Sequence, residues 1–192
     1  HHLNTMKKPF IFTVGVLFCS TLLGQSLTAS FSYVPFYSPD GPYIETYLSV
    51  HGESVVYDTI ETNNLQGAVE AITIFKQNDS IIFADKYKLS SPLININDST
   101  KPDFLDQFRI SIAEGVYQLE FELRDVHELA SENTPLTYKE ILVINFPNDS
   151  LCMSGIQLIE SFQKATNKNK YTKSGIDLIP YPTNYYPPTA EV

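Results

Sequence analysis

Residues Phe108 to Asp125 read FRISIAEGVYQLEFELRD, and this stretch decides the fold class. Apolar residues alternate with polar residues from Phe108 to Ile112 and again from Tyr117 onward. An alternation with a period of two residues is what a β-strand with one buried and one solvated face requires. The stretch therefore predicts two consecutive strands, joined by the short segment that contains Gly115.

The residues that begin the second alternating stretch resemble a known structural motif. Gly115 lies two residues before Tyr117, as in the tyrosine corner of immunoglobulin-like sandwiches, where the phenol bonds back to the backbone of the turn. Further strands are predicted at residues 43–50, 54–59, 65–76, 81–89 and 138–146, with a short first strand at 31–34. Residues 77–80 are expected to close a hairpin, and residues 101–107 to form one helical turn. About seven strands over residues 25–147 predict an all-β sandwich of the immunoglobulin or fibronectin type.

The amino-terminal residues 1–24 are interpreted as upstream residues followed by a signal peptide. Two lysines precede an apolar run from Pro9 to Leu23, which is short for a membrane span. Cleavage is predicted near Gly24–Gln25, with Ala29–Ser30 as the second choice. The mature chain is therefore expected to be exported and to contain no transmembrane span.

Charge and cysteine content narrow the functional classes. The formal net charge is −9 at pH 7. Removal of residues 1–24 deletes two lysines and no acidic residue, so the mature chain is more negative still. This acidic balance argues against nucleic-acid binding, which demands a basic surface, so no nucleic-acid partner is predicted. Only Cys152 would remain in the mature chain, so the apolar core has to hold the fold without an intrachain disulfide. A hydrophobic content of 43% makes such a core feasible.

The composition changes after residue 147. Asn and Lys dominate residues 167–173, and four prolines crowd residues 180–188. Residues 156–165 fit either a short helix or the opening strand of a further unit. Residues 148–192 are therefore interpreted as a partly ordered extension: a linker or the start of a second, incomplete β domain.

Four blocks of the sequence resemble a known family. They are YVPFYSPDGPYIETYLSV (33–50), FLDQFRISIAEGVYQLEFELRD (104–125), SGIQLIESF (154–162) and SGIDLIPYPTNYYP (174–187). In this order they resemble the amino-terminal part of the GWxTD-domain proteins of Bacteroidetes. The resemblance covers nearly the whole mature chain and implies export; the family has no established biochemical activity.

The chain departs from this family in one respect. The Gly-Trp-x-Thr-Asp motif lies near the carboxyl end of family members, whereas this sequence contains no Trp. The chain is therefore expected to be the first part of a longer protein. No functional residue can be carried over from the family, because the motif that names it is absent.

No catalytic, metal or cofactor site is predicted. His51 and His127 have no partners at ligand spacing, and a metal site needs three or four converging ligands. Cys152 has no basic neighbour in the sequence to lower the pKa of its thiol. All three residues are interpreted as structural or solvated.

The tyrosines offer a candidate binding surface. Tyr43 and Tyr47 alternate with Ile44, Leu48 and Val50, so they lie together on the other face of their strand. Packing within the protein is the favoured interpretation. The alternative is an exposed tyrosine strip that stacks on sugars or contacts a protein partner.

Asp-Ser and Asp-Thr pairs form a further pattern. They place Thr59, Ser80, Ser99 and Ser150 after an aspartate and before an aliphatic residue or Thr. These triplets resemble the acceptor sequence of the general O-glycosylation system of Bacteroidetes. The alternative is that the pairs simply form turns.

The function predicted from the sequence is a non-enzymatic binding or scaffolding module of an exported cell-envelope protein, periplasmic or associated with the outer membrane. Its partner would be an unknown protein or glycan. The alternatives are a carbohydrate-binding sandwich that uses the tyrosine-rich strands, and an accessory domain of a larger envelope enzyme. Fold class alone does not choose among them.

Overall fold

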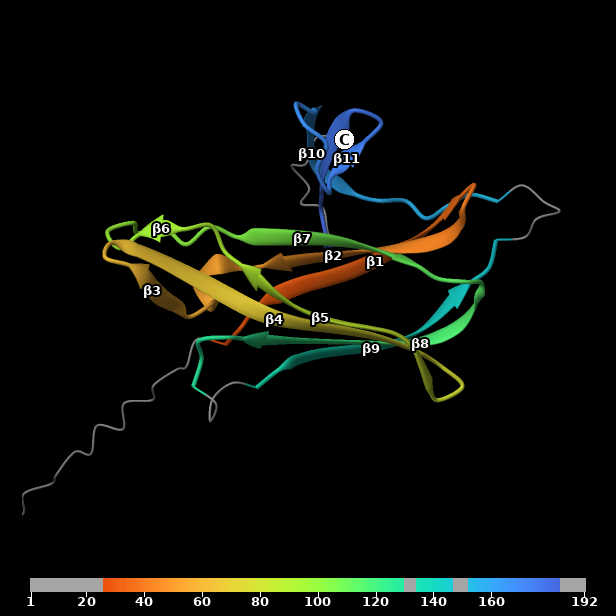
Figure 1. Cartoon of the computed structure of the whole chain (residues 1–192), viewed down its shortest axis with the longest axis horizontal. Helices are drawn as coiled ribbons and strands as arrows, with labels where there is room; N and C mark the ends of the chain where they lie inside the picture. Colours follow the sequence, from red (N-terminus) through yellow and green to blue (C-terminus); the bar gives the residue numbers. More distant parts are fainter. Residues whose placement is uncertain (1–25, 130–133, 147–151, 184–192) are drawn as a thin grey trace, which may run out of the picture.

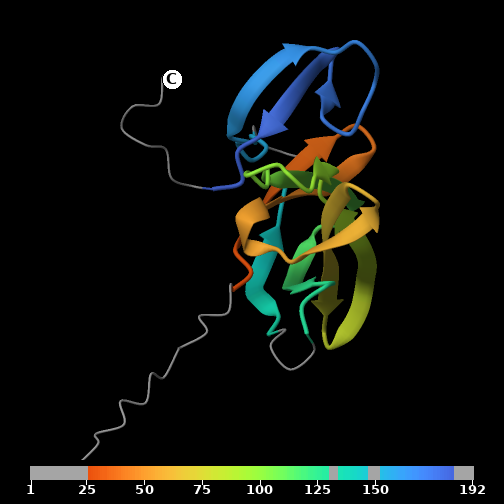
Figure 2. The same cartoon turned by 90° about the vertical axis from the view of Figure 1, so that its left-hand side faces the viewer.

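The computed structural model describes residues 26–129, 134–146 and 152–183. Two antiparallel sheets pack face to face, and a third, smaller sheet lies on the outer side of the first (Figures 1 and 2). The only helix in the described residues is the 3-10 turn η1 (Gly52–Ser54). The prediction of an all-β sandwich is confirmed.

The first sheet has the order β1-β2-β7 and consists of β1 (Ala29–Ser38), β2 (Gly41–Val50) and β7 (Phe104–Ser111). The facing sheet has the order β3-β4-β8-β9 and consists of β3 (Tyr57–Glu61), β4 (Asn64–Gln77), β8 (Gly115–Asp125) and β9 (Leu136–Ile144). Two more strands of this sheet pair with β4, namely β5 (Ser80–Ser90) and β6 (Ile94–Asn95).

The carboxyl-terminal part also forms a sheet, which we call the C-terminal sheet. It has the order β10-β12-β11 and consists of β10 (Ile159–Lys164), β11 (Thr172–Lys173) and β12 (Ile176–Pro180). Of the two interpretations of residues 156–165, the strand is therefore correct and the helix is wrong. The expected boundary at residue 148 lies outside the described residues.

Apolar side chains from the two large sheets fill the space between them. One cluster joins Leu48 and Val50 of β2 to Val69 of β4 and Leu123 of β8. A second cluster joins Ile44 of β2 to residues of β4, β8 and β9, among them Phe75, Leu119 and Leu142. The alternation along β2 and β8 therefore places the predicted apolar face in the core.

Two local predictions are corrected. Residues 101–107 do not form a helical turn: β7 begins at Phe104, which pairs with Val50 and is buried. Pairing with β2 outweighs the local helical preference there. The strand predicted at residues 54–59 begins only at Tyr57, because the chain first makes the turn η1.

The hairpin predicted around residues 77–80 is present, with positive φ angles of 47° at Asn78 and 62° at Asp79.

The turn before β8 fixes the start of that strand. The hydroxyl of Tyr117 donates a hydrogen bond to the backbone oxygen of Ala113 at 3.0 Å. Gly115 has a φ of +157°, and a Cβ there would lie 2.7 Å from Nε2 of Gln77 and 3.2 Å from the Tyr117 ring. A side chain at this φ would be strained and its Cβ would crowd the Tyr117 ring, so the turn favours glycine.

Substitution of Tyr117 by Phe should lower the free energy of unfolding by about 1 kcal/mol, because the change removes one buried hydrogen bond and keeps the ring. Urea denaturation of the two proteins measures the difference. Tyr37→Phe is the matched control, since Tyr37 is 46% exposed and its hydroxyl makes no hydrogen bond within the described residues. Equal midpoints for Tyr117→Phe and the control would show that the corner contributes nothing.

Candidate functional site

The site is built around an acidic residue on the central strand of the first sheet. Glu45 lies in β2, directly opposite Arg109 of β7, and shares the outer strand face with Tyr43 and Tyr47. An acid on the outer face of a sandwich is ordinarily solvated. Here Glu45 is 0% exposed. Its burial follows from the C-terminal sheet, which lies over this face of β1, β2 and β7 (Figures 1 and 2).

The carboxylate of Glu45 is surrounded by hydrogen-bond donors from both parts of the molecule. They are Tyr47 Oη at 2.6 Å, Gln107 Nε2 at 3.1 Å, Arg109 Nε at 3.0 Å and Nη2 at 2.5 Å, and Lys173 Nζ at 2.7 Å. The first three residues belong to the first sheet, whereas Lys173 reaches in from β11 of the C-terminal sheet. A buried carboxylate is tolerated only with such complete pairing.

These contacts set the charge state of the cluster. Burial alone would raise the pKa of Glu45, but the hydrogen bonds from Lys173 and Tyr47 outweigh burial and hold the pKa below that of an ordinary glutamate. Burial and the hydrogen bond to Glu45 raise the pKa of Tyr47. Glu45 is therefore ionised and Tyr47 protonated throughout the physiological pH range.

Further polar contacts fasten the C-terminal sheet to the sandwich. Lys170 pairs with Asp106, and the hydroxyl of Tyr171 donates to the backbone oxygen of Leu105 at 3.0 Å. On the way to this sheet, the backbone nitrogen of Gly155 donates to the oxygen of Pro35 in β1 at 2.9 Å. The sheet is thus held by charged and backbone groups at several points.

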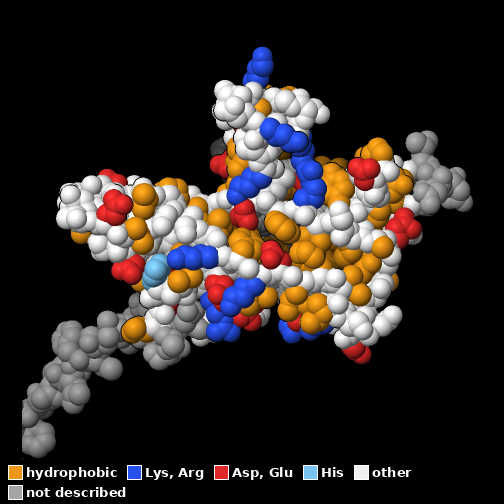
Figure 3. All heavy atoms as spheres, in the orientation of Figure 1, with side chains coloured by type: hydrophobic (Ala, Val, Ile, Leu, Met, Phe, Trp, Pro, Cys, Tyr) orange, Lys and Arg blue, Asp and Glu red, His pale blue; other side chains and the backbone are white. Residues whose placement is uncertain are grey.

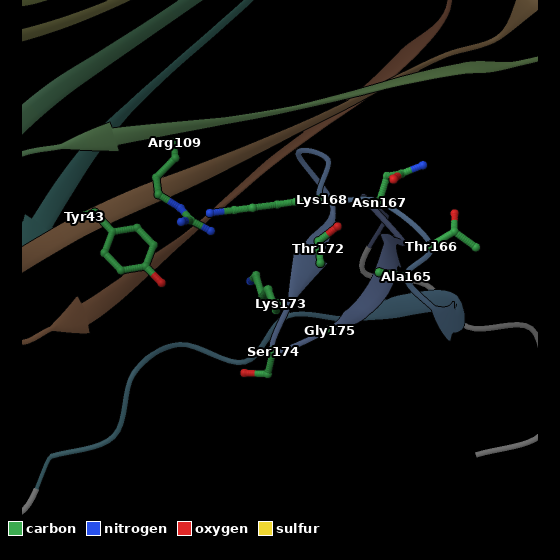
Figure 4. A pocket seen from close by; sticks show the side chains of 10 residues that line it. All are labelled: Tyr43, Arg109, Ala165, Thr166, Asn167, Lys168, Thr172, Lys173, Ser174 and Gly175. Carbon is green, nitrogen blue, oxygen red and sulfur yellow. The ribbon is translucent and has the colours of Figure 1, made fainter.

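A cleft of about 660 Å³ opens beside the Glu45 cluster, between the first sheet and the C-terminal sheet (Figure 4). Its lining residues are Tyr43, Arg109, Ala165, Thr166, Asn167, Lys168, Thr172, Lys173, Ser174 and Gly175. Lys and Arg side chains lie along the C-terminal sheet and at its junction with the sandwich (Figure 3). The volume is that of a site for a small molecule or one or two sugar units.

The two tyrosines for which an exposed strip was the alternative to internal packing have different positions. Tyr47 is only 2% exposed, because the C-terminal sheet covers it. It therefore packs within the protein and is not part of an exposed strip. Tyr43 does line the cleft. Its ring already packs on Phe36, with centroids 5.4 Å apart, and on the Arg109 guanidinium at 4.9 Å.

The other candidate residues lie away from the cleft. Thr59, Ser80 and Ser99 are exposed, and Ser150 lies outside the described residues. Gly115 and Tyr117 form the turn before β8.

The histidines and the cysteine do not converge. Nδ1 of His51 lies 2.9 Å from Asp103, Nδ1 of His127 lies 3.8 Å from Asp58, and Cys152 is exposed. No group of metal-ligating side chains occurs among the residues that the structure describes.

The residues that make the cluster were missed at the sequence level for a physical reason. Alternation places Glu45 beside Tyr43 and Tyr47 but does not reveal what covers that face. Lys173 is 128 positions away in the chain. The signal in the sequence is limited to an acid between two tyrosines on one strand face, a pattern that a solvated surface also allows.

Glu45→Gln should destabilise the protein at pH 7 by about 3 kcal/mol, because it removes the buried charge that pairs with Arg109 and Lys173 and leaves their donors facing a neutral amide. The folded-state pKa of Glu45 lies below the unfolded value of about 4.3, so its contribution is complete above that value. It is lost as the pH falls through the folded-state pKa. Urea denaturation from pH 7 to pH 3 should therefore show the gap between wild type and variant narrowing with acid.

Glu122→Gln serves as the control for this pH series, since Glu122 pairs with Arg124 at the surface and should change stability little. A gap between wild type and Glu45→Gln that stays constant over the pH range would contradict the charge state assigned to Glu45.

Comparison with known proteins finds no match: no family model, no curated protein and no solved structure is similar to this chain. Among the described residues, no helix has the length and apolar character needed to cross a bilayer.

Proposed function

We propose that this chain is a non-enzymatic binding module of an exported envelope protein, periplasmic or associated with the outer membrane, and that its ligand site is the cleft beside Glu45. The basic and apolar amino-terminal residues support export. The four quoted sequence blocks support a place in the amino-terminal part of the GWxTD-domain family. The observation that carries the proposal is the cleft itself, which two separate parts of the chain build together.

The chemistry of the cluster favours binding over catalysis. A general base needs a carboxylate that can accept a proton near neutral pH. The carboxylate of Glu45 is buried, its two oxygens are fully engaged by donors, and its pKa is lowered. These are the properties of a residue that fixes the positions of cations.

The carbohydrate-binding alternative loses part of its basis. Sugar stacking requires an open aromatic face. Tyr47 is buried, and the Tyr43 ring already packs on Phe36 and Arg109. A sugar in the cleft would therefore be held by its polar groups. The accessory-domain alternative would use the same cleft within a longer protein.

Filling the cleft should abolish ligand binding. Ala165→Phe adds a ring at the cleft lining without changing charge, and Ala84→Phe places the same ring on an exposed position of β5. We expect an array of neutral and acidic glycans and peptides to reveal a ligand that wild type and Ala84→Phe bind alike. Ala165→Phe should bind this ligand at least tenfold more weakly, since the ring takes its place.

Equal thermal midpoints of the two Phe variants would show that the fold is intact. Unchanged binding by a folded Ala165→Phe would contradict the assignment of the cleft as the ligand site.

A further inference from the structure

We infer that the cleft takes an oxyanion, a carboxylate or phosphate group of its ligand, between Arg109 and Lys168. This inference rests on the proposed function, because it names the chemistry of the ligand for the same site.

The lining of the cleft is positively charged. The chain as a whole is acidic, with a formal net charge of −9. The described cleft lining contains three cations, Arg109, Lys168 and Lys173, and no acidic residue. Glu45 lies behind them with no exposed surface, and its single charge cannot neutralise all three. The cleft is therefore locally positive in an acidic protein, which attracts anions.

The guanidinium of Arg109 is preorganised to bind an anion. Its Nε and Nη2 atoms bond to Glu45, and its guanidinium lies over the Tyr43 ring. The Arg109 side chain is nevertheless 52% exposed, and Nη1 makes no hydrogen bond to the described residues. A guanidinium held on one edge and open on the other offers fixed donors to a carboxylate or a phosphate. Little side-chain entropy is then lost on binding.

Lys168 provides the second cation. In Figure 4 its side chain extends from the segment between β10 and β11 toward Arg109. Within the described residues it makes no hydrogen bond and no ion pair. Lys170 of the same segment pairs with Asp106, and Lys173 of β11 pairs with Glu45. Lys168 is thus the lysine of this segment that the docking of the C-terminal sheet does not use.

The facing arrangement of Arg109 and Lys168 favours an anion between them. Like charges that approach one another repel, and the repulsion is stronger beside low-dielectric protein than in water. An oxyanion between the two groups replaces this repulsion by two charge-assisted hydrogen bonds. The uncharged lining residues Thr166, Asn167 and Ser174 offer polar groups to the remainder of a hydrophilic ligand.

The test is a calorimetric titration of the protein with galacturonate, galactose and inorganic phosphate. Galactose matches galacturonate except for the carboxylate, so galacturonate should bind and galactose should not. Binding of galacturonate without phosphate would assign the anion as a sugar carboxylate, and the reverse would assign a phosphate group. Raising the NaCl concentration should weaken binding, because salt screens the charges.

Lys168→Gln should weaken anion binding about tenfold, since one charge-assisted contact is lost. Lys88→Gln makes the same charge change on β5 of the facing sheet, away from the cleft, and should leave anion binding unaltered. Failure of galacturonate and phosphate to bind, or equal weakening by both variants, would overturn the inference. The proposed function would survive that result if a neutral ligand bound wild type and was blocked by Ala165→Phe.

Discussion

The buried carboxylate of Glu45 is the constraint on which the arrangement of this molecule depends. Glu45 lies on the central strand of the first sheet and has no solvent-exposed surface. A buried carboxylate is stable there only if cations pair with it. Arg109 supplies one from the neighbouring strand, and Lys173 supplies the other from the C-terminal sheet. This ion-pair cluster is therefore one of the contacts that fix the position of that sheet, because losing Lys173 would leave the carboxylate incompletely paired.

The same cluster shapes the cleft. By engaging one edge of Arg109, Glu45 holds the guanidinium against Tyr43 and leaves its other edge open. Glu45 also binds Lys173 of β11, next to the segment between β10 and β11 that lines the cleft. Lys168 of that segment extends toward Arg109 (Figure 4). The first sheet and the docked C-terminal sheet therefore present positioned charges to a ligand, and a small number of placed polar groups is what gives such a site its selectivity.

The sandwich was predictable from the sequence, and the site was not. Alternation around Gly115 and Tyr117 identifies β8, and the polar residues 77–80 identify the hairpin, because both signals are local. The start of β7 at Phe104 depends on pairing with β2, which a local reading of residues 101–107 cannot supply. The contact between Glu45 and Lys173 spans 128 positions, and neither residue differs locally from a solvated one.

Amide hydrogen exchange of wild type and Lys173→Met tests most directly whether this cluster holds the C-terminal sheet. The substitution removes the ammonium group and keeps an apolar stem, and Lys168→Met makes the same change at a lysine that the docking does not use. If the cluster holds this sheet, amide exchange should be faster in β10, β11 and β12 of Lys173→Met, unchanged in β4 and β8, and like wild type in the control. Unchanged exchange in the C-terminal sheet of Lys173→Met would contradict this role of the cluster.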